Sequence, residues 1–277
     1  MHWWKRLIVP VCTAVFLFSS YKVAATYEGK VQNDKLYEQV RQEFASPAPQ
    51  TNQSERGEPR QQPPLPKAPL PAGTEDAPET AVKPAAEPAA KPEVLPVYKK
   101  LLAQNKDTVG WIRVPGTPID YPVVQTKDNS YYIHHNFKRK RSAWGAIFMD
   151  YRNAPDGDNR NTILYGHHMK DGSMFKGLTQ YRKESFFNKN MMISFSTKYE
   201  EIEYEVFSVY VAEADEPYLQ TSFRSGRDYT DFLVQLQQKS LFSRGLAFSK
   251  NDKILTLSTC SYEYENARLV VHARRIP

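Results

Sequence analysis

The chain has 277 residues, 20 prolines, two cysteines and a formal net charge of +6. This mild positive charge, without a nucleic-acid-binding motif, argues against a nucleic-acid-binding protein. It suits a surface that faces anionic envelope polymers or lipid head groups, although ordinary solubilising charge explains it equally well. Cys12 lies in an N-terminal apolar run and cannot plausibly pair with Cys260, so no disulfide framework exists. A lone cysteine in the folded part of an exported protein requires an explanation, and a reactive thiol is one.

The N-terminus carries an apolar run at residues 7–18, directly after Lys5 and Arg6. The two charges predict that the N-terminus stays in the cytoplasm and that the rest of the chain crosses the membrane. The run is short for a full span unless it extends to about Ala25. A cleaved signal peptide is the alternative, because residues 23–25 resemble a small-residue cleavage site. We therefore assign residues 1–26 to a membrane anchor or signal segment and predict that the body is exported.

The next segment, residues 27–93, is predicted to be a disordered linker. Residues 27–45 show weak helical periodicity and many charges, whereas residues 46–93 consist mainly of Pro, Ala, Glu, Lys and Gln. Such a composition buries too little apolar surface to offset the entropy of ordering. Its prolines favour extended polyproline II conformers. The linker would hold the folded domain, residues 94–277, away from the membrane.

The folded domain shows mainly strand signals, which are runs rich in Val, Ile, Tyr and Phe between turn residues. Short helices are expected at 97–105 and 185–188, and a longer amphipathic helix at 228–241. Eight short strands with few helices predict a mainly β fold, a closed or nearly closed mixed barrel with peripheral helices. The predicted strands are 110–114, 119–124, 145–149, 162–165, 192–196, 201–212, 253–258 and 269–273.

A candidate nucleophile ends one of these strands. The apolar run at 254–260 ends at Cys260, turn-like residues follow, and Arg268 opens the next strand. Two strands joined in this way should form a hairpin that places Cys260 beside Arg268. A guanidinium near a thiol favours the thiolate and can hold a developing oxyanion. The alternative is that Cys260 is a small buried hydrophobe and Arg268 a surface charge.

The candidate base is His167, which follows a strand that ends at Gly166 and precedes a loop, where functional residues often lie. The adjacent histidines at 134–135 and 167–168 invite a metal-binding interpretation. Neighbours on a strand point to opposite faces, however, and no cluster of His, Cys or carboxylate residues has metal-ligand spacing. We therefore predict neither a metal nor another cofactor.

Several of these stretches resemble class B sortases. They are YGHHMKDGSMF at 165–175, TLSTC at 256–260, ARLVVHAR at 267–274, GWI at 110–112 and DNSYYI at 128–133. The resemblance covers residues 94–277 and the order of all the motifs. It implies an eight-stranded sortase-type β-barrel with an extra helix between two late strands, which 228–241 matches. The N-terminal segment and the Pro-rich linker lie outside it.

The resemblance also implies a reaction. Such an enzyme cleaves the C-terminal sorting signal of a secreted protein through a thioester, then transfers the acyl group to an amine of peptidoglycan or to a pilin lysine. By position, Cys260 matches the nucleophile, His167 the acid/base and Arg268 the oxyanion partner. The resemblance implies a Gram-positive cell envelope, and the apolar run after Lys5 and Arg6 predicts a single span of the cell membrane with the catalytic domain outside the cell. Substrate-binding positions match Asn129, Ile133, Tyr165, Ser258 and Thr259.

Elementary chemistry agrees with this assignment, because acyl transfer needs a nucleophile, a proton carrier near neutral pKa and oxyanion donors. Two alternatives stay open from the residues alone. One is a cysteine peptidase or cell-wall hydrolase, although papain-like enzymes place Cys before His in the chain and here His167 precedes Cys260. The other is a tethered, non-catalytic binding domain, in which Cys260 would be inert to thiol reagents.

Overall fold

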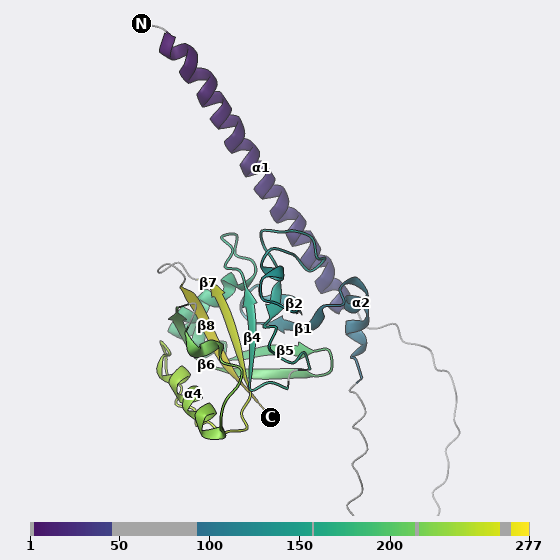
Figure 1. Cartoon of the computed structure of the whole chain (residues 1–277), viewed down its shortest axis with the longest axis vertical. Helices are drawn as coiled ribbons and strands as arrows, with labels where there is room; N and C mark the ends of the chain where they lie inside the picture. Colours follow the sequence, from purple (N-terminus) through teal and green to yellow (C-terminus); the bar gives the residue numbers. More distant parts are fainter. Residues whose placement is uncertain (1–2, 46–92, 157, 214–215, 261–266, 277) are drawn as a thin grey trace, which may run out of the picture.

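The computed structural model describes residues 3–45, 93–156, 158–213, 216–260 and 267–276, with residues 3–9 and Cys260 described through their backbone alone. A β-barrel forms the body of the molecule, and a long helix, α1 (Trp3–Ala45), runs past it and projects into solvent (Figure 1). Most of the predicted linker, residues 46–92, lies outside the described residues.

The eight strands form a closed barrel in the order β1-β2-β3-β4-β7-β8-β6-β5, which confirms the predicted mainly β fold. The barrel is mixed, because the β2–β3 and β4–β7 pairs are parallel and the other pairs antiparallel. Each strand overlaps one of the predicted runs. The strands are β1 (Thr108–Arg113), β2 (Asp120–Val124), β3 (Ile147–Met149), β4 (Asn161–Gly166), β5 (Met192–Thr197), β6 (Glu201–Ala212), β7 (Ile254–Cys260) and β8 (Arg268–Arg275).

The core has two parts, on the two faces of the sheet. Strand residues alternate between faces. On β8, Leu269 and Val271 belong to the main core, whereas Val270 packs into a second cluster outside it. Helix α4 (Gly226–Gln238) supplies much of this second cluster and matches the amphipathic helix predicted at 228–241. The helix ends earlier than predicted because the chain turns back after it, and Leu241 N donates to Val209 O at 2.8 Å.

The other helices are short. Helices α2 (Pro96–Gln104) and α3 (Glu184–Lys189) match the predicted runs within one residue at each end. Three 3₁₀ helices were not predicted, because such short elements have no amphipathic period long enough to detect. They are η1 (Tyr131–Ile133), η2 (Phe175–Arg182) and η3 (Pro217–Leu219).

Helix α1 departs from the prediction, because residues 27–45 are helical and packed rather than part of a linker. Tyr37 and Val40 are buried in the main core, and Phe44 stacks on Trp111 with ring centroids 4.0 Å apart. The buried positions recur at helical spacing along one face, and the other faces carry the charges. This single docked stripe explains why the periodicity in the sequence is weak.

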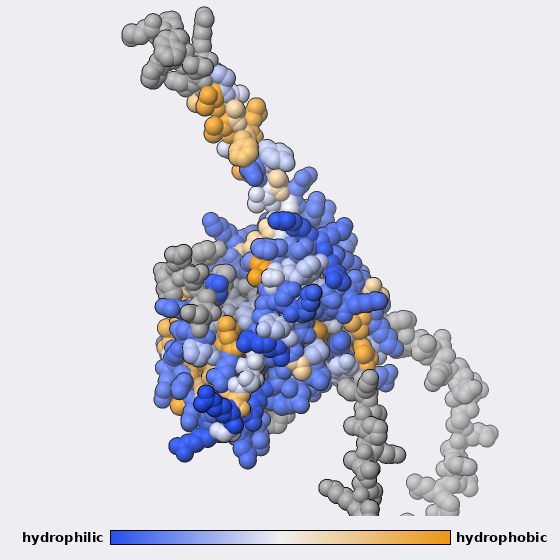
Figure 2. Space-filling view, in the orientation of Figure 1, coloured by the Kyte–Doolittle hydropathy of each residue, from blue (hydrophilic) through white to orange (hydrophobic). Residues whose placement is uncertain are grey.

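The N-terminal part of α1 is exposed and apolar. Val15, Phe16 and Phe18 are each exposed by more than half. Figure 2 shows a hydrophobic band on the part of α1 that projects beyond the barrel. In the part of the chain that the structure describes, no helix combines the length and the hydropathy that a membrane span requires. The predicted single span is therefore not confirmed.

Candidate functional site

The parallel pairing of β4 with β7 brings the candidate base to the candidate nucleophile. The last pair in this register is Gly166 opposite Thr259. His167 and Cys260 are the next residues along their strands, and neighbouring strands lie about 4.8 Å apart. Two residues that are 93 positions apart in the sequence therefore have adjacent backbones at one end of the barrel.

The predicted hairpin brings the candidate oxyanion partner to the same end. β7 and β8 pair antiparallel, and Cys260 lies directly opposite Arg268. Arg274, by contrast, pairs with Ile254 at the far end of the hairpin, where its guanidinium contacts Glu205 at 3.3 Å. The side chain of Cys260 and residues 261–266 lie outside the described part of the structure.

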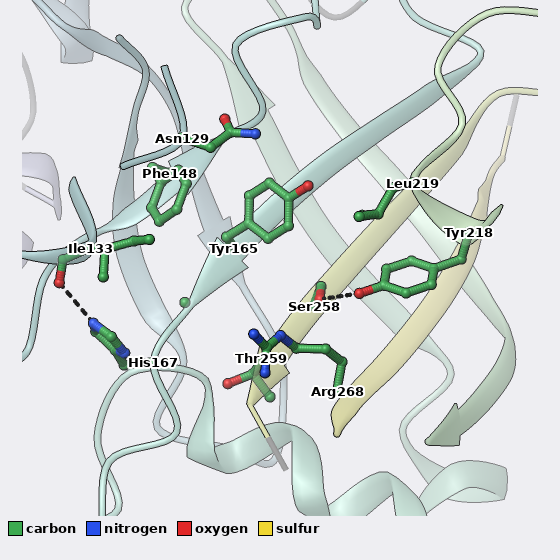
Figure 3. A pocket seen from close by; sticks show the side chains of 11 residues that line it. Asn129, Ile133, Phe148, Tyr165, His167, Tyr218, Leu219, Ser258, Thr259 and Arg268 are labelled. Atoms are coloured by element: carbon green, nitrogen blue, oxygen red, sulfur yellow. Dashed lines mark hydrogen bonds between the residues drawn. The ribbon is translucent and has the colours of Figure 1, made fainter. Parts of the chain in front are cut away.

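A pocket of about 380 Å³ opens at this end of the barrel (Figure 3). His167 and Arg268 line it, as does every residue that the sequence predicts to bind substrate. Four further lining residues were not predicted. The complete lining is Asn129, Ile133, Phe148, Tyr165, Gly166, His167, Tyr218, Leu219, Ser258, Thr259 and Arg268.

The imidazole of His167 is oriented by a main-chain acceptor. Its Nε2 lies 2.7 Å from the carbonyl oxygen of Ile133 (Figure 3). A carbonyl can only accept, so Nε2 carries the hydrogen in this contact. Nδ1 is then the nitrogen that can exchange a proton with a reacting group. The neighbouring His168 is buried, forms a β-bridge with Met174 and does not line the pocket, as expected for adjacent residues on opposite faces.

A buried carboxylate holds one wall of the pocket. Tyr165 Oη and Asn129 Nδ2 donate to Asp150 Oδ2 at 2.9 and 3.0 Å. Arg152 donates to the same carboxylate through Nε and Nη2, both at 2.8 Å, and its Nη2 also donates to Leu219 O at 3.0 Å. Burial raises the pKa of Asp150, but hydrogen bonds from Arg152, Tyr165 and Asn129 outweigh it and hold the pKa below its usual range.

A second polar network supports the part of the wall formed by Tyr218 and Ser258. Tyr218 Oη and Ser258 Oγ lie 3.1 Å apart at the pocket (Figure 3), and Asn161 Nδ2 donates to Tyr218 O at 3.1 Å. Thr256 Oγ1 donates to Asn161 Oδ1 at 2.7 Å and lies 2.9 Å from His272 Nδ1. Burial and the charge of Lys239 lower the pKa of His272 to about 3. His272 is therefore a neutral structural residue and does not compete with His167 as a base.

Of the four pocket residues that the sequence did not reveal, Gly166 ends β4 and the other three come from β3 and η3. Phe148 lies on β3, where every residue is buried, so no alternation marks it as special. Tyr218 and Leu219 lie on η3, which follows β6 and is tied to the pocket by contacts with residues distant in the sequence. The sole local signal there is Pro217, which marks a turn. Among the described residues, no group of three or more His, Cys, Asp or Glu side chains could hold a metal ion.

Comparisons with known proteins identify the family. A family model for the sortase domain matches residues 112–276. Sortase B of Listeria monocytogenes is 40% identical over 186 residues, which are 66% of this chain and 76% of that protein. Sortase B of Staphylococcus aureus is 41% identical over 185 residues, with the same two coverages.

Solved structures match as well. The crystal structure of sortase B from Bacillus anthracis in complex with AAEK1 has a TM-score of 0.62 at 44% identity, and the match covers 68% of this chain and 88% of that one. The Staphylococcus aureus sortase B–substrate complex has a TM-score of 0.62 at 41% identity, covering 66% and 86%. The domain model spans more than half of the sequence, and the relatives match over three quarters of their length, so this chain belongs to the sortase family and is a sortase B-like transpeptidase.

Proposed function

We propose that Cys260 is the nucleophile of this transpeptidase, that His167 is its general acid and base, and that Arg268 stabilises the oxyanion. The observation that supports this most strongly is the strand register. Cys260 on β7 pairs with Arg268 on β8, and His167 directly follows Gly166, the last residue of β4, which pairs with Thr259 next to Cys260. The pocket lined by His167 and Arg268 opens at the same place.

The proposed reaction has two halves. The Cys260 thiolate attacks the carbonyl of a threonine in the sorting signal, and Arg268 donates to the oxyanion that forms. His167 gives a proton to the leaving amide nitrogen, the C–N bond breaks and a thioester remains. An amine then attacks the thioester and loses a proton to His167, and the Cys260 sulfur leaves as the thiolate. One histidine serves both steps because it returns to its starting protonation state.

The carbonyl of Ile133 would take the orienting role that a carboxylate has in other nucleophile–base arrangements. Holding Nε2–H at 2.7 Å fixes the ring and stabilises the imidazolium through a dipole. Because Nε2 keeps its hydrogen in this bond, the proton that passes to the substrate nitrogen is the one on Nδ1. This arrangement supports the assignment of His167 although no carboxylate has the sequence context of a third catalytic member.

We also propose that the pocket binds the sorting signal, with Tyr165, Asn129 and Ile133 on one side and Ser258 and Thr259 on the other. The pocket is lined by aromatic and aliphatic surface with a few amide and hydroxyl groups (Figure 3), which fits a short peptide of mixed character. The acceptor is an amine of peptidoglycan or a pilin lysine. Incubation of the acyl-enzyme with triglycine or with a lysine-containing pilin-like peptide distinguishes them by the mass of the product.

Sortases act outside the cell in Gram-positive bacteria. We propose that residues 94–277 form the catalytic domain and that the exposed apolar part of α1 attaches the enzyme to the cell membrane as its N-terminal anchor. The band around Phe16 and Phe18, which follows Lys5 and Arg6, supports this. Fractionation of cells with N-terminal sequencing tests it. A mature protein that starts at Thr26 in the soluble fraction would overturn the anchor in favour of a cleaved signal.

The catalytic assignment is tested with a reporter peptide. This is a fluorogenic peptide selected on the wild-type enzyme from a library with threonine at the cleavage position. Cys260→Ala should abolish cleavage and transfer, and intact mass of the wild type should show a thioester adduct. His167→Ala should lose at least about 100-fold in rate, while the folded His168→Ala variant keeps most activity. Cleavage that persists in Cys260→Ala, or an exchange of behaviour between the two histidine variants, would overturn the assignment.

A further inference from the structure

The backbone of Gly145 is in direct contact with the His167 site. Gly145 has φ +59, a left-handed conformation that favours glycine. A methyl group in place of its side-chain hydrogen would lie 2.7 Å from the Ile133 carbonyl oxygen and 3.0 Å from His167 Cδ2. The turn segment before β3 that contains Gly145 therefore lies against both the imidazole and the acceptor that orients it.

Helix α1 contacts this segment through Tyr37 and Gly29. Tyr37, which is 1% exposed, donates its hydroxyl to the Gly145 carbonyl oxygen at 3.2 Å. About two turns towards the N-terminus, Gly29 lies against the ring of Trp144. A methyl group on Gly29 would be 2.9 Å from that ring. Two consecutive residues of the segment, Trp144 and Gly145, are thus fixed by α1.

The same helix also holds the loop that follows His167. The Tyr37 ring packs edge to face on Tyr121, with centroids 5.0 Å apart and an interplanar angle of 87°. Tyr121 Oη accepts a hydrogen bond from Met174 N at 3.1 Å. Phe175 N, the next residue, donates to His167 O at 2.9 Å. Tyr37 is therefore connected to His167 in two ways, through Gly145 and, by way of Tyr121, through the loop that follows the histidine.

A second contact secures the same loop. Trp144 Nε1 donates to Asp171 Oδ2 at 2.8 Å, and Asp171 in turn accepts from Ser173 N at 3.0 Å. The negative charge of Asp171 also faces Lys30 of α1. The loop after His167 is therefore attached to residues that themselves pack against the helix, so a displacement of α1 reaches the imidazole along two routes.

We propose that α1 is a structural part of the active site and that Tyr37 is a positioning residue for His167. The inference rests on the proposed role of His167 as acid and base. Tyr37 does not line the pocket, so it should affect the rate of proton transfer and not the binding of the peptide. Attachment of the helix would then link the catalytic competence of the domain to the segment that leads to the membrane.

The test compares Tyr37→Phe with Tyr98→Phe in the full-length enzyme. The two tyrosines are a matched pair. Each is buried, and each lies on a helix that precedes the first strand of the barrel, α1 for Tyr37 and α2 for Tyr98. Each donates to a main-chain carbonyl, which for Tyr98 is Ser196 O at 2.9 Å. Of the two tyrosines, only Tyr37 contacts the residues that pack around His167, which are Gly145 and Tyr121. We expect Tyr37→Phe to lower kcat for the reporter peptide about fivefold, the scale of one neutral hydrogen bond, with KM unchanged. Tyr98→Phe should leave both constants unchanged.

The second readout does not depend on activity. Nitrogen-15 NMR of the histidine rings, with His167 assigned by the loss of its signals in His167→Ala, reports which ring nitrogen carries the hydrogen. Tyr37→Phe should reduce the Nε2–H population of His167, and Tyr98→Phe should not. If His167→Ala stays active, the proposed function fails. If His167→Ala is inactive but Tyr37→Phe matches Tyr98→Phe in kcat and in the spectrum, the catalytic assignment stands and this inference is overturned.

Discussion

Replacement of Asp150 by asparagine tests how far the pocket depends on one buried carboxylate. Asp150 is fully buried and accepts five hydrogen bonds, three from Arg152 and one each from Tyr165 and Asn129. Asparagine keeps one acceptor oxygen. If that oxygen stays with the main chain and Nε of Arg152, the new NH₂ group faces three donors. Tyr165 can rotate its hydroxyl to accept, but Arg152 Nη2 and the Asn129 amide cannot.

The expected cost follows from these contacts. Two lost hydrogen bonds contribute roughly 1 kcal/mol each, more where a charge is involved. Removal of one partner of a buried ion pair costs about 3–5 kcal/mol, but the Arg152 side chain is 37% exposed and can regain water. We therefore expect Asp150→Asn to lower the free energy of unfolding by about 3 kcal/mol. Because Asn129, Tyr165 and the Leu219 carbonyl lose their common partner, KM for the reporter peptide should rise on the order of tenfold.

The contribution of Asp150 to the free energy of unfolding should depend on pH. The pKa of Asp150 is lowered in the folded state, so its contribution to stability is present above the ordinary carboxyl pKa of about 4 and is lost as the pH falls through the lower, folded-state value. Urea denaturation at several pH values should show wild type and Asp150→Asn converging below about pH 4. Asp158→Asn is the control, because this aspartate is 78% exposed in its pair with Lys253. A loss under 0.5 kcal/mol for Asp150→Asn at pH 7 would refute the reasoning.

Three further predictions follow from the site and its supports. Arg268→Lys should lower kcat/KM severely although the charge is kept, because lysine cannot donate in a two-pronged geometry. Arg274→Lys, the control, should have a mild effect. Near-normal turnover of Arg268→Lys would show that a positive potential suffices. Gly145→Ala should lower kcat at least about tenfold, since the methyl group would displace the acceptor of His167, and a normal kcat would contradict that contact. Ser225→Ala removes the cap of α4 and should cost about 1 kcal/mol in thermal unfolding with kcat unchanged.

The barrel and the three proposed catalytic residues could be predicted from the sequence because their signals are local. Each strand is a short apolar run between turn residues. Cys260, His167 and Arg268 all occur at strand ends next to small or turn-forming residues. Their proximity was predictable only for the hairpin partners Cys260 and Arg268. The parallel β4–β7 register that brings in His167 depends on the order of strands in the barrel, which no local pattern encodes.

The supports of the site could not be predicted, because their partners are distant in the sequence. Asp150 follows a short strand and resembles a surface turn residue until Tyr165 and Asn129 are folded against it. Residues 27–45 were predicted to be a linker because charges dominate their composition. Tyr37 and Val40 alone say little about docking, and their burial depends on a matching surface on the barrel.

If His167 is the acid and base that we propose, its orientation by a main-chain carbonyl makes the residues behind that carbonyl part of its support. A carboxylate partner belongs to a side chain, which can follow the imidazole by rotating about its own bonds. The Ile133 carbonyl has no such freedom, because its direction is set by the backbone of η1 and by whatever packs against it. The chain can therefore specify the hydrogen bond only through residues that shape this backbone, which are Gly145 in contact and Tyr37 behind it. On this argument the active site does not end at the pocket wall but includes the docked half of α1.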